Sequence, residues 1–369
     1  MASAPKQTNR KWVALSMAAG LAVFASYLYS VAGVNDILKI FETINPYYYS
    51  LGFVAVLLST LCFSLTWNSL LSGLQVKISY WKTFVFSWVG MFVDEVIPGG
   101  ISGDFFKSYL ISKDSELDVG KVVASVVVQK LFTVAIVTVN LTAGLVLLTL
   151  NYGLQPEFLI LAVVSISLLA ALFIALVYFS VRPKATERAV GWIARIVSIV
   201  RRKNWDKMRF QESARKTLGP FHEGVQSIRG NSRALIKAAV FSSLASVFDV
   251  ILIFLVFSAV RYPVPVDKVL IVYALTVSLQ ASGVTVVGFT EVVMISLYSA
   301  LGIPVALSSV ITLLSRFASL WFKLSIAFVS FQCVVFNRCV CSVCNRVSLR
   351  HAHMVPEQAS TKQTPLKTE

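Results

Sequence analysis

The sequence predicts an all-α polytopic membrane protein with about six full transmembrane helices and two re-entrant broken-helix hairpins, arranged as an inverted repeat. Of its 369 residues, 56% are hydrophobic and only 14% are charged, whereas soluble domains average roughly a quarter charged residues. Apolar runs recur along the chain, and six are long enough to cross the ~30 Å hydrocarbon core of a bilayer. Two further apolar stretches are interrupted by glycine, proline or acidic residues, which predicts the hairpins.

Short polar loops or the hairpins separate the predicted spans. The spans cover residues 12–34, 46–74, 119–150, 158–181, 235–260 and 305–336. The predicted organisation is an N-terminal segment at 1–11, a membrane region at 12–181 holding the first repeat and the fourth span, a basic segment at 182–234 with an interfacial helix, a second membrane region at 235–336 and a disordered tail at 337–369.

The stretch from Val93 to Asp104 interrupts the first hairpin. It holds one proline, three glycines and three carboxylates within twelve residues. Proline removes a backbone donor and glycine favours turns, so this composition does not continue a helix. Non-helical backbone persists at membrane depth only where it is buried in protein or lines a wet cavity. The stretch therefore predicts the tip of a re-entrant hairpin.

A second broken hairpin is predicted at 269–304, with interruptions around 281–283 and 288–291. Each half then reads as span, span, hairpin, span, and three crossings per half place the second copy upside down. The positive-inside rule fits this arrangement, because segments rich and poor in Lys/Arg alternate along the chain. We therefore expect a multi-pass protein of the cytoplasmic membrane with both termini in the cytoplasm. Inverted repeats with broken helices are typical of secondary transporters.

Ionisable residues in the predicted membrane region form the candidate site. They are Asp94, Glu95, Asp104, Lys107, Lys130, Asp249, Glu291, Arg316 and Lys323. Each costs roughly 2.5–3.5 kcal/mol on insertion scales, so opposite charges should pair. The simplest pairing joins Asp104 with Lys130 and Glu291 with Arg316. Two interpretations stay open: the pairs hold the hairpins against neighbouring spans, or they form a binding site.

In the functional interpretation, helix N-termini after the two breaks and the nearby cations hold a lipid phosphate. The predicted substrate-binding residues are Gly99, Gly100, Gly103, Asp104, Lys107, Lys130, Gly288, Glu291 and Arg316. The predicted gating or coupling residues are Asp94, Glu95 and Asp249. No catalytic residue, cofactor or metal is expected.

The net charge of +15 is concentrated between the two membrane regions. Residues 182–233 hold thirteen Lys/Arg against four Asp/Glu. Such a block between spans indicates orientation and contact with anionic headgroups. It forms no recognisable nucleic-acid-binding module, so no nucleic-acid partner is expected.

Several motifs carry a family resemblance. They are Val96 to Asp104, Lys107 to Leu110, Ala124 to Lys130, Gly288 to Glu291, Gly302 to Pro304, and Arg316. On these residues, and over about 12–336, the chain resembles the transmembrane region of lysylphosphatidylglycerol synthases, also called the flippase-like domain family. The resemblance implies a lipid translocase. Since no aminoacyltransferase domain follows residue 336, lysine transfer itself is not expected.

The chain departs from the family pattern at three places. Gln129 and Lys130 stand where the family usually carries an acidic residue and an arginine, and Lys107 stands where arginine is common. Residues 281–285 lack the family's proline-glycine lead-in to the second hairpin. The resemblance therefore implies the fold and leaves the lipid open.

We expect a protein that translocates an anionic lipid, either a phospholipid or a polyprenyl-phosphate-linked lipid. Two alternatives stay open. The tandem carboxylates Asp94 and Glu95 would suit an enzyme that holds a metal for glycosyl or phosphoryl transfer, although adjacent helical residues point about 100° apart. Otherwise the chain is a scaffold that presents a lipid to a separate transferase.

Overall fold

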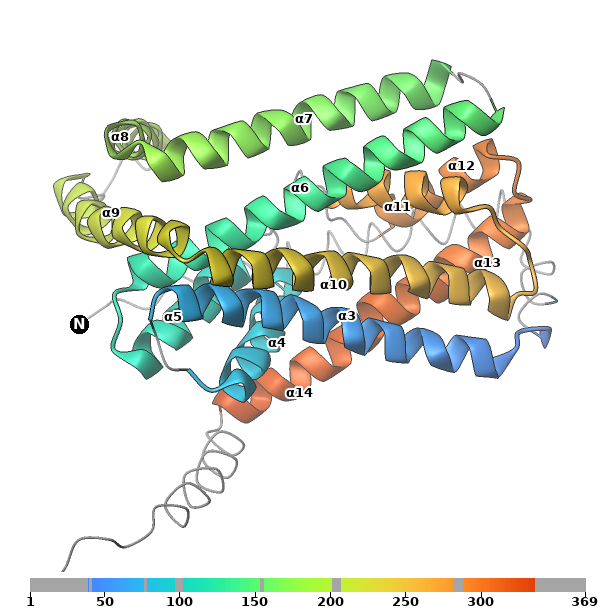
Figure 1. Ribbon diagram of the computed structural model, residues 1–369, viewed down its shortest axis with the longest axis horizontal. Coiled ribbons are helices and arrows are strands. Elements are labelled where there is room, and N and C mark those ends of the chain that lie inside the picture. The colour runs from blue at the N-terminus through green and yellow to red at the C-terminus, as the bar shows by residue number, and fades with distance from the viewer. Residues whose placement is uncertain are drawn as a thin grey trace, which may run out of the picture.

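The computed structural model describes residues 39, 42–75, 78–96, 102–152, 156–200, 207–281 and 288–335, and every regular element in these ranges is a helix (Figure 1). Five of the described helical segments are long and apolar enough to cross a membrane. They are α3 (Pro46–Gly73), α6 (Val119–Tyr152), α7 (Pro156–Val181), α10 (Ser232–Ala259) and the run of α13 (Val305–Arg316), the π-helical segment η2 (Phe317–Phe322) and α14 (Lys323–Val335). The all-α polytopic prediction is confirmed. The first predicted span, 12–34, lies outside the described residues.

Helices α3 and α10 form a long central pair, side by side over most of their lengths (Figure 1). Each is preceded by an N-cap asparagine whose side chain accepts a backbone N–H: Asn45 from Tyr47 at 3.0 Å and Asn231 from Ala234 at 3.1 Å. These caps satisfy donors that the first helical turn leaves free. Small residues allow close approach, and a Cβ at Gly73 would lie 3.3 Å from the Cβ of Ala234. The pair joins the two halves of the chain.

The two predicted hairpins correspond to two pairs of short helices. The first pair is α4 (Tyr80–Val96) with α5 (Ser102–Ser115), and the second is α11 (Val266–Ala281) with α12 (Phe289–Ala300). All four are shorter than the ~20 residues that a spanning helix needs. The pairs lie toward opposite ends of the long helices (Figure 1). That placement agrees with one hairpin entering from each side.

The first helical break is narrower than the sequence predicts. Helix α4 continues through Asp94 and Glu95 and ends at Val96, so both carboxylates lie in its last turn. Residues 97–101, which include Gly99 and Gly100, and residues 282–287 lie outside the described residues. The re-entrant path of the chain therefore stays a prediction.

Each helix pair packs against a helix of the other half. Helix α4 contacts α14 through Phe92 and Phe331, whose ring centroids are 4.8 Å apart. Helix α11 contacts α6 at Gly144, where a Cβ would lie 2.9 Å from the backbone nitrogen of Ile271. Small residues commonly permit such approach between membrane helices. The two halves therefore interlock, and polar residues of both reach their shared interior.

The basic segment forms two helices, α8 (Pro183–Val200) and α9 (Lys207–Gly230). Helix α9 packs on α6, where Gly224 lies against the backbone of Lys121, and its Ile228 is buried. On α8, Trp192 is exposed. Whether α8 lies on a membrane surface stays a prediction, as do the boundaries of the predicted segments.

Candidate functional site

Asp104 is the charged centre of the first helix pair. It lies in the first turn of α5, and its two carboxylate oxygens bind different lysines. Oδ1 lies 2.7 Å from the Nζ of Lys107, and Oδ2 lies 3.0 Å from the Nζ of Lys130. The predicted pairing of Asp104 with Lys130 is confirmed. Lys107 is a second partner, which the sequence did not indicate.

Lys107 is enclosed by protein. It is only 3% exposed, and its Nζ lies 4.8 Å from the ring centroid of Trp67 and 5.5 Å from that of Phe63. It also donates to Oε1 of Gln129 at 3.4 Å. These contacts hold the cation against Asp104. A substrate-binding role for Lys107 stays a prediction, but its contacts indicate that it positions Asp104.

Glu291 is the corresponding centre of the second helix pair. Its Oε1 accepts from Nε of Arg316 at 2.7 Å, and its Oε2 accepts from the backbone N–H of Gly288 at 2.7 Å. Gly288 has a φ of 97°, a conformation that glycine adopts without strain. The predicted pairing of Glu291 with Arg316 is confirmed. Because Arg316 uses Nε for this pair, its two terminal amino groups are left for other partners.

The two centres repeat the same local design. Asp104 is the third residue of α5 and Glu291 the third of α12, and each binds a cation on the following long helix. The last turn of the first helix in each pair also carries polar residues, Asp94 and Glu95 in α4 and Gln280 in α11. In the first pair, the backbone N–H of Gly103 donates to Oδ1 of Asp94 at 2.7 Å, which ties α4 to the start of α5. The repetition agrees with an internal repeat.

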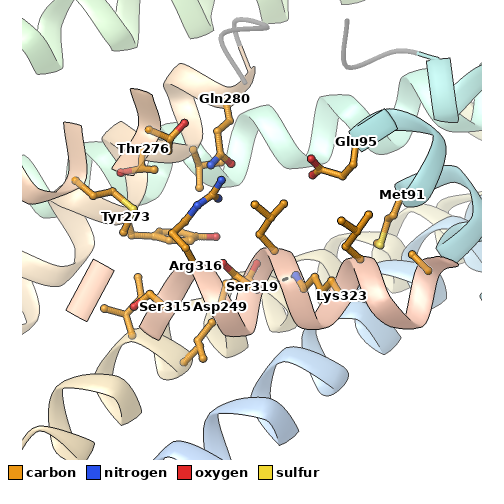
Figure 2. Close-up of a pocket in the computed structure, with 18 residues that line it drawn as sticks. Met91, Glu95, Asp249, Tyr273, Thr276, Gln280, Ser315, Arg316, Ser319 and Lys323 are labelled. Atoms are coloured by element: carbon orange, nitrogen blue, oxygen red, sulfur yellow. Dashed lines mark ion pairs between the residues drawn. The ribbon is translucent and has the colours of Figure 1, made fainter. Parts of the chain in front are cut away.

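A cavity of about 330 Å³ lies on the inner face of α13, η2 and α14, and we call it the Arg316 cavity. Figure 2 shows Arg316 extending toward Gln280, with Glu95 on the opposite side. The polar or charged lining residues are Glu95, Asp249, Tyr273, Thr276, Gln280, Thr290, Ser315, Arg316, Ser319 and Lys323. Ser315 is buried, and its hydroxyl has no hydrogen-bond partner among the described residues.

A second cavity, of about 460 Å³, lies beside α5 and α6, and we call it the Lys130 cavity. Its charged lining residues are Asp94, Glu95, Asp104 and Lys130, and much of the remaining wall is aliphatic. Glu95, Val277 and Gln280 line both cavities. The cavities are therefore neighbours, separated in part by the last turns of α4 and α11.

Asp249, predicted to act in gating or coupling, lies in the Arg316 cavity. Its Oδ1 accepts from the hydroxyl of Ser59 at 2.7 Å and lies 3.9 Å from the Nζ of Lys323. The structure thus brings Asp249 and Glu95 to one cavity, and Asp94 and Glu95 to the other. The roles assigned to these residues stay predictions.

Sequence reasoning missed several lining residues. Lys323 was among the candidate intramembrane charges but was assigned no binding or gating role, although it lines the same cavity as Arg316. Gln280 and the hydroxyl-bearing residues carry no charge, so no sequence signal separated them from ordinary core residues. The π-helical segment η2 directly after Arg316 was also unexpected, and such segments occur frequently at functional sites.

Five long apolar helical segments, with charged side chains lining the cavities between them, define an integral, polytopic membrane protein. Comparison with known families agrees: the chain matches the family "Lysylphosphatidylglycerol synthase TM region" over residues 14–327, and it belongs to that family.

Three archaeal relatives are described as UPF0104 membrane proteins. The chain is 25% identical to one from Methanocaldococcus jannaschii, over 80% of this chain and 88% of the relative. It is 23% identical to one from Pyrococcus horikoshii, over 79% and 88%. It is 22% identical to one from Methanothermobacter thermautotrophicus, over 79% and 86%. No solved structure matches the chain.

Proposed function

We propose that this protein translocates an anionic lipid, either a phospholipid or a polyprenyl-phosphate-linked lipid, across the cytoplasmic membrane. The observation that carries the proposal is the pair of neighbouring cavities, each containing the cation of one acid–base pair. Because Glu95 and Gln280 line both cavities, polar side chains extend from the first helix pair to the second. A headgroup moving along them would keep polar contacts at every step.

The cations suit a phosphate. The terminal amino groups of Arg316 present a fork that matches phosphate oxygens. Lys323 adds a second cation in the same cavity. A volume of about 330 Å³ lies in the range of small-ligand sites and would hold a headgroup. The acyl or prenyl chains would stay in the bilayer.

The arrangement of the helix pairs supports movement from one leaflet to the other. The pairs lie toward opposite ends of the long helices (Figure 1), so the two cavities would be reached from different sides. Rocking of one half against the other would open each cavity in turn, as in transporters built from repeats. The name of the family supports a lipid as the substrate. In this proposal both termini are cytoplasmic.

Lipid movement in proteoliposomes tests the proposal. The purified protein should accelerate the exchange of fluorescent phosphatidylglycerol, or of a fluorescent polyprenyl phosphate, between leaflets, measured by bleaching of the outer leaflet. Replacing both members of one pair, Arg316→Gln with Glu291→Gln, should abolish the acceleration without leaving a buried charge unpaired.

A matched control is the exposed ion pair between Lys82 and Asp114, whose atoms are 2.8 Å apart. The variant Lys82→Gln with Asp114→Asn also removes one ion pair and should keep full activity. If the unmodified protein moves neither lipid, or if the Arg316/Glu291 double variant moves lipid as fast as the control, the proposal is wrong. Copurification with a transferase in the absence of lipid movement would favour the scaffold alternative.

A further inference from the structure

Glu95 differs from the other carboxylates of the site. It lies in the last turn of α4, lines both cavities, and its carboxylate faces the Arg316 cavity (Figure 2). Among the described residues it makes no hydrogen bond and no ion pair. Its side chain is exposed, and the space around it is that of the two cavities. A proton or a ligand can therefore reach it directly.

The other four carboxylates are held by donors. Asp104 binds two lysines, and Glu291 binds Arg316 and the N–H of Gly288. Asp94 accepts the N–H of Gly103, and Asp249 accepts the hydroxyl of Ser59 beside Lys323. Protonating any of these would weaken a hydrogen bond that the charged form accepts. Glu95 has no such bond to lose.

The formal charges around the two cavities explain why binding of a headgroup would require a proton. The network holds five carboxylates (Asp94, Glu95, Asp104, Asp249 and Glu291) and four cations (Lys107, Lys130, Arg316 and Lys323), so its formal charge is −1 when the cavities are empty. A phosphodiester headgroup would raise this to −2 at a site surrounded by apolar helices. Like charges close together in a poorly polarisable interior repel strongly. One proton bound by these carboxylates compensates the additional negative charge of the headgroup.

We propose that Glu95 takes up one proton when an anionic headgroup enters the cavities, so that headgroup and proton cross the membrane together. This inference rests on the proposed lipid translocation and adds its coupling ion. With Glu95 neutral, the phosphate reaches Arg316 and Lys323 without repulsion from a charged Glu95, and the headgroup can pass between Glu95 and Gln280. Release of the headgroup returns the proton to water.

The titratable groups around Glu95 line the two cavities or lie close to them. They are Asp94 on its own helix, Asp104 on α5, Lys130 on α6, Asp249 on α10, Tyr273 on α11, Glu291 on α12, Arg316 on α13 and Lys323 on α14. A bound phosphate would neutralise Arg316 and Lys323, two cations that line the cavity beside Glu95. Headgroup binding should therefore strengthen as the pH falls, by up to about tenfold per pH unit where one proton is taken up.

Calorimetry on the purified full-length protein in detergent tests the inference. The probes are dihexanoyl-phosphatidylglycerol and farnesyl phosphate, each titrated in Tris and in PIPES, whose ionisation enthalpies differ. The difference in heat should correspond to uptake of about one proton per phosphatidylglycerol bound. Glu95→Gln should bind at least as tightly, without proton uptake and with little dependence on pH.

Two variants serve as controls. Glu95→Asp keeps the carboxylate and should keep the uptake. Glu187→Gln makes the same chemical change on an exposed residue of α8 and should behave as the unmodified protein. Binding of phosphatidylglycerol without proton uptake, or unchanged uptake in Glu95→Gln, would overturn the coupling and leave lipid translocation standing. Failure of the unmodified protein to bind either probe would overturn both.

Discussion

At the scale of single residues, Asp104 and Glu291 are built as fixed counter-charges. Each places both carboxylate oxygens on donors, Asp104 on Lys107 and Lys130, and Glu291 on Arg316 and a backbone N–H. A carboxylate with both oxygens committed keeps its cation in one orientation. In this account the acids hold the cations, and the cations meet the ligand.

The Glu291–Arg316 pair should show strong energetic coupling. Glu291 is buried, so Glu291→Gln alone leaves a cation without its counter-charge and should cost about 3–5 kcal/mol, as should Arg316→Gln alone. The double variant should cost less than the sum of the two, with a coupling on the order of 1–3 kcal/mol. Unfolding by SDS in mixed micelles measures all four proteins. Additive losses would show that the two side chains do not stabilise one another.

The two lysines that bind Asp104 should differ in importance. The side chain of Lys107 is 4% exposed and that of Lys130 is 47% exposed. Lys107→Gln should therefore destabilise the protein by about 3 kcal/mol or more, whereas Lys130→Gln should cost less than about 1 kcal/mol. The same unfolding assay compares them. Equal losses would contradict the assignment of Lys107 as the structural partner.

At the scale of elements, the design depends on close helix contacts. Helices α4 and α5 cross where Gly90 meets Gly103, and a Cβ on Gly103 would overlap the carbonyl of Gly90. This crossing brings Asp94 to the N-terminus of α5. The segment η2 is held against α3 through Phe53, whose ring centroid lies 4.8 Å from that of Phe322 and 6.4 Å from that of Phe317. Arg316 is the residue directly before η2, so this contact with α3 also fixes its position.

Gly103→Ala should disrupt the first helix pair. The added methyl group meets backbone rather than a flexible side chain, so α5 must move away from α4 and the Gly103–Asp94 hydrogen bond should be lost. We expect a loss of about 2 kcal/mol or more. Gly191→Ala on α8 is the control, because nothing lies within 4 Å of its added Cβ, and alanine is the better helix former by about 1 kcal/mol. Equal stability of the two variants would argue against a tight crossing.

At the scale of the whole molecule, the sequence predicts the helices and the ion pairs better than the region where the two helix pairs come together. Long apolar runs define the spans, and the cost of a charge in lipid correctly predicts both Asp104–Lys130 and Glu291–Arg316. The enclosure of Lys107 was not predictable, because its cage comes from Trp67, Phe63 and Gln129 on other helices. The shared cavity wall depends on how α4 and α11 approach in space. The spacing of residues along the sequence carries no information about the distance between α4 and α11.

Photo-crosslinking with a phosphatidylglycerol that carries a diazirine in its headgroup tests the central claim most directly. The account predicts labels within 273–280 and 315–327, on the walls of the Arg316 cavity, and their suppression by excess unlabelled phosphatidylglycerol. The same diazirine placed at the end of an acyl chain should instead label the outer face of α7, whose side chains are largely exposed. Headgroup labels confined to that outer face, with none on α11, α13 or α14, would contradict the account.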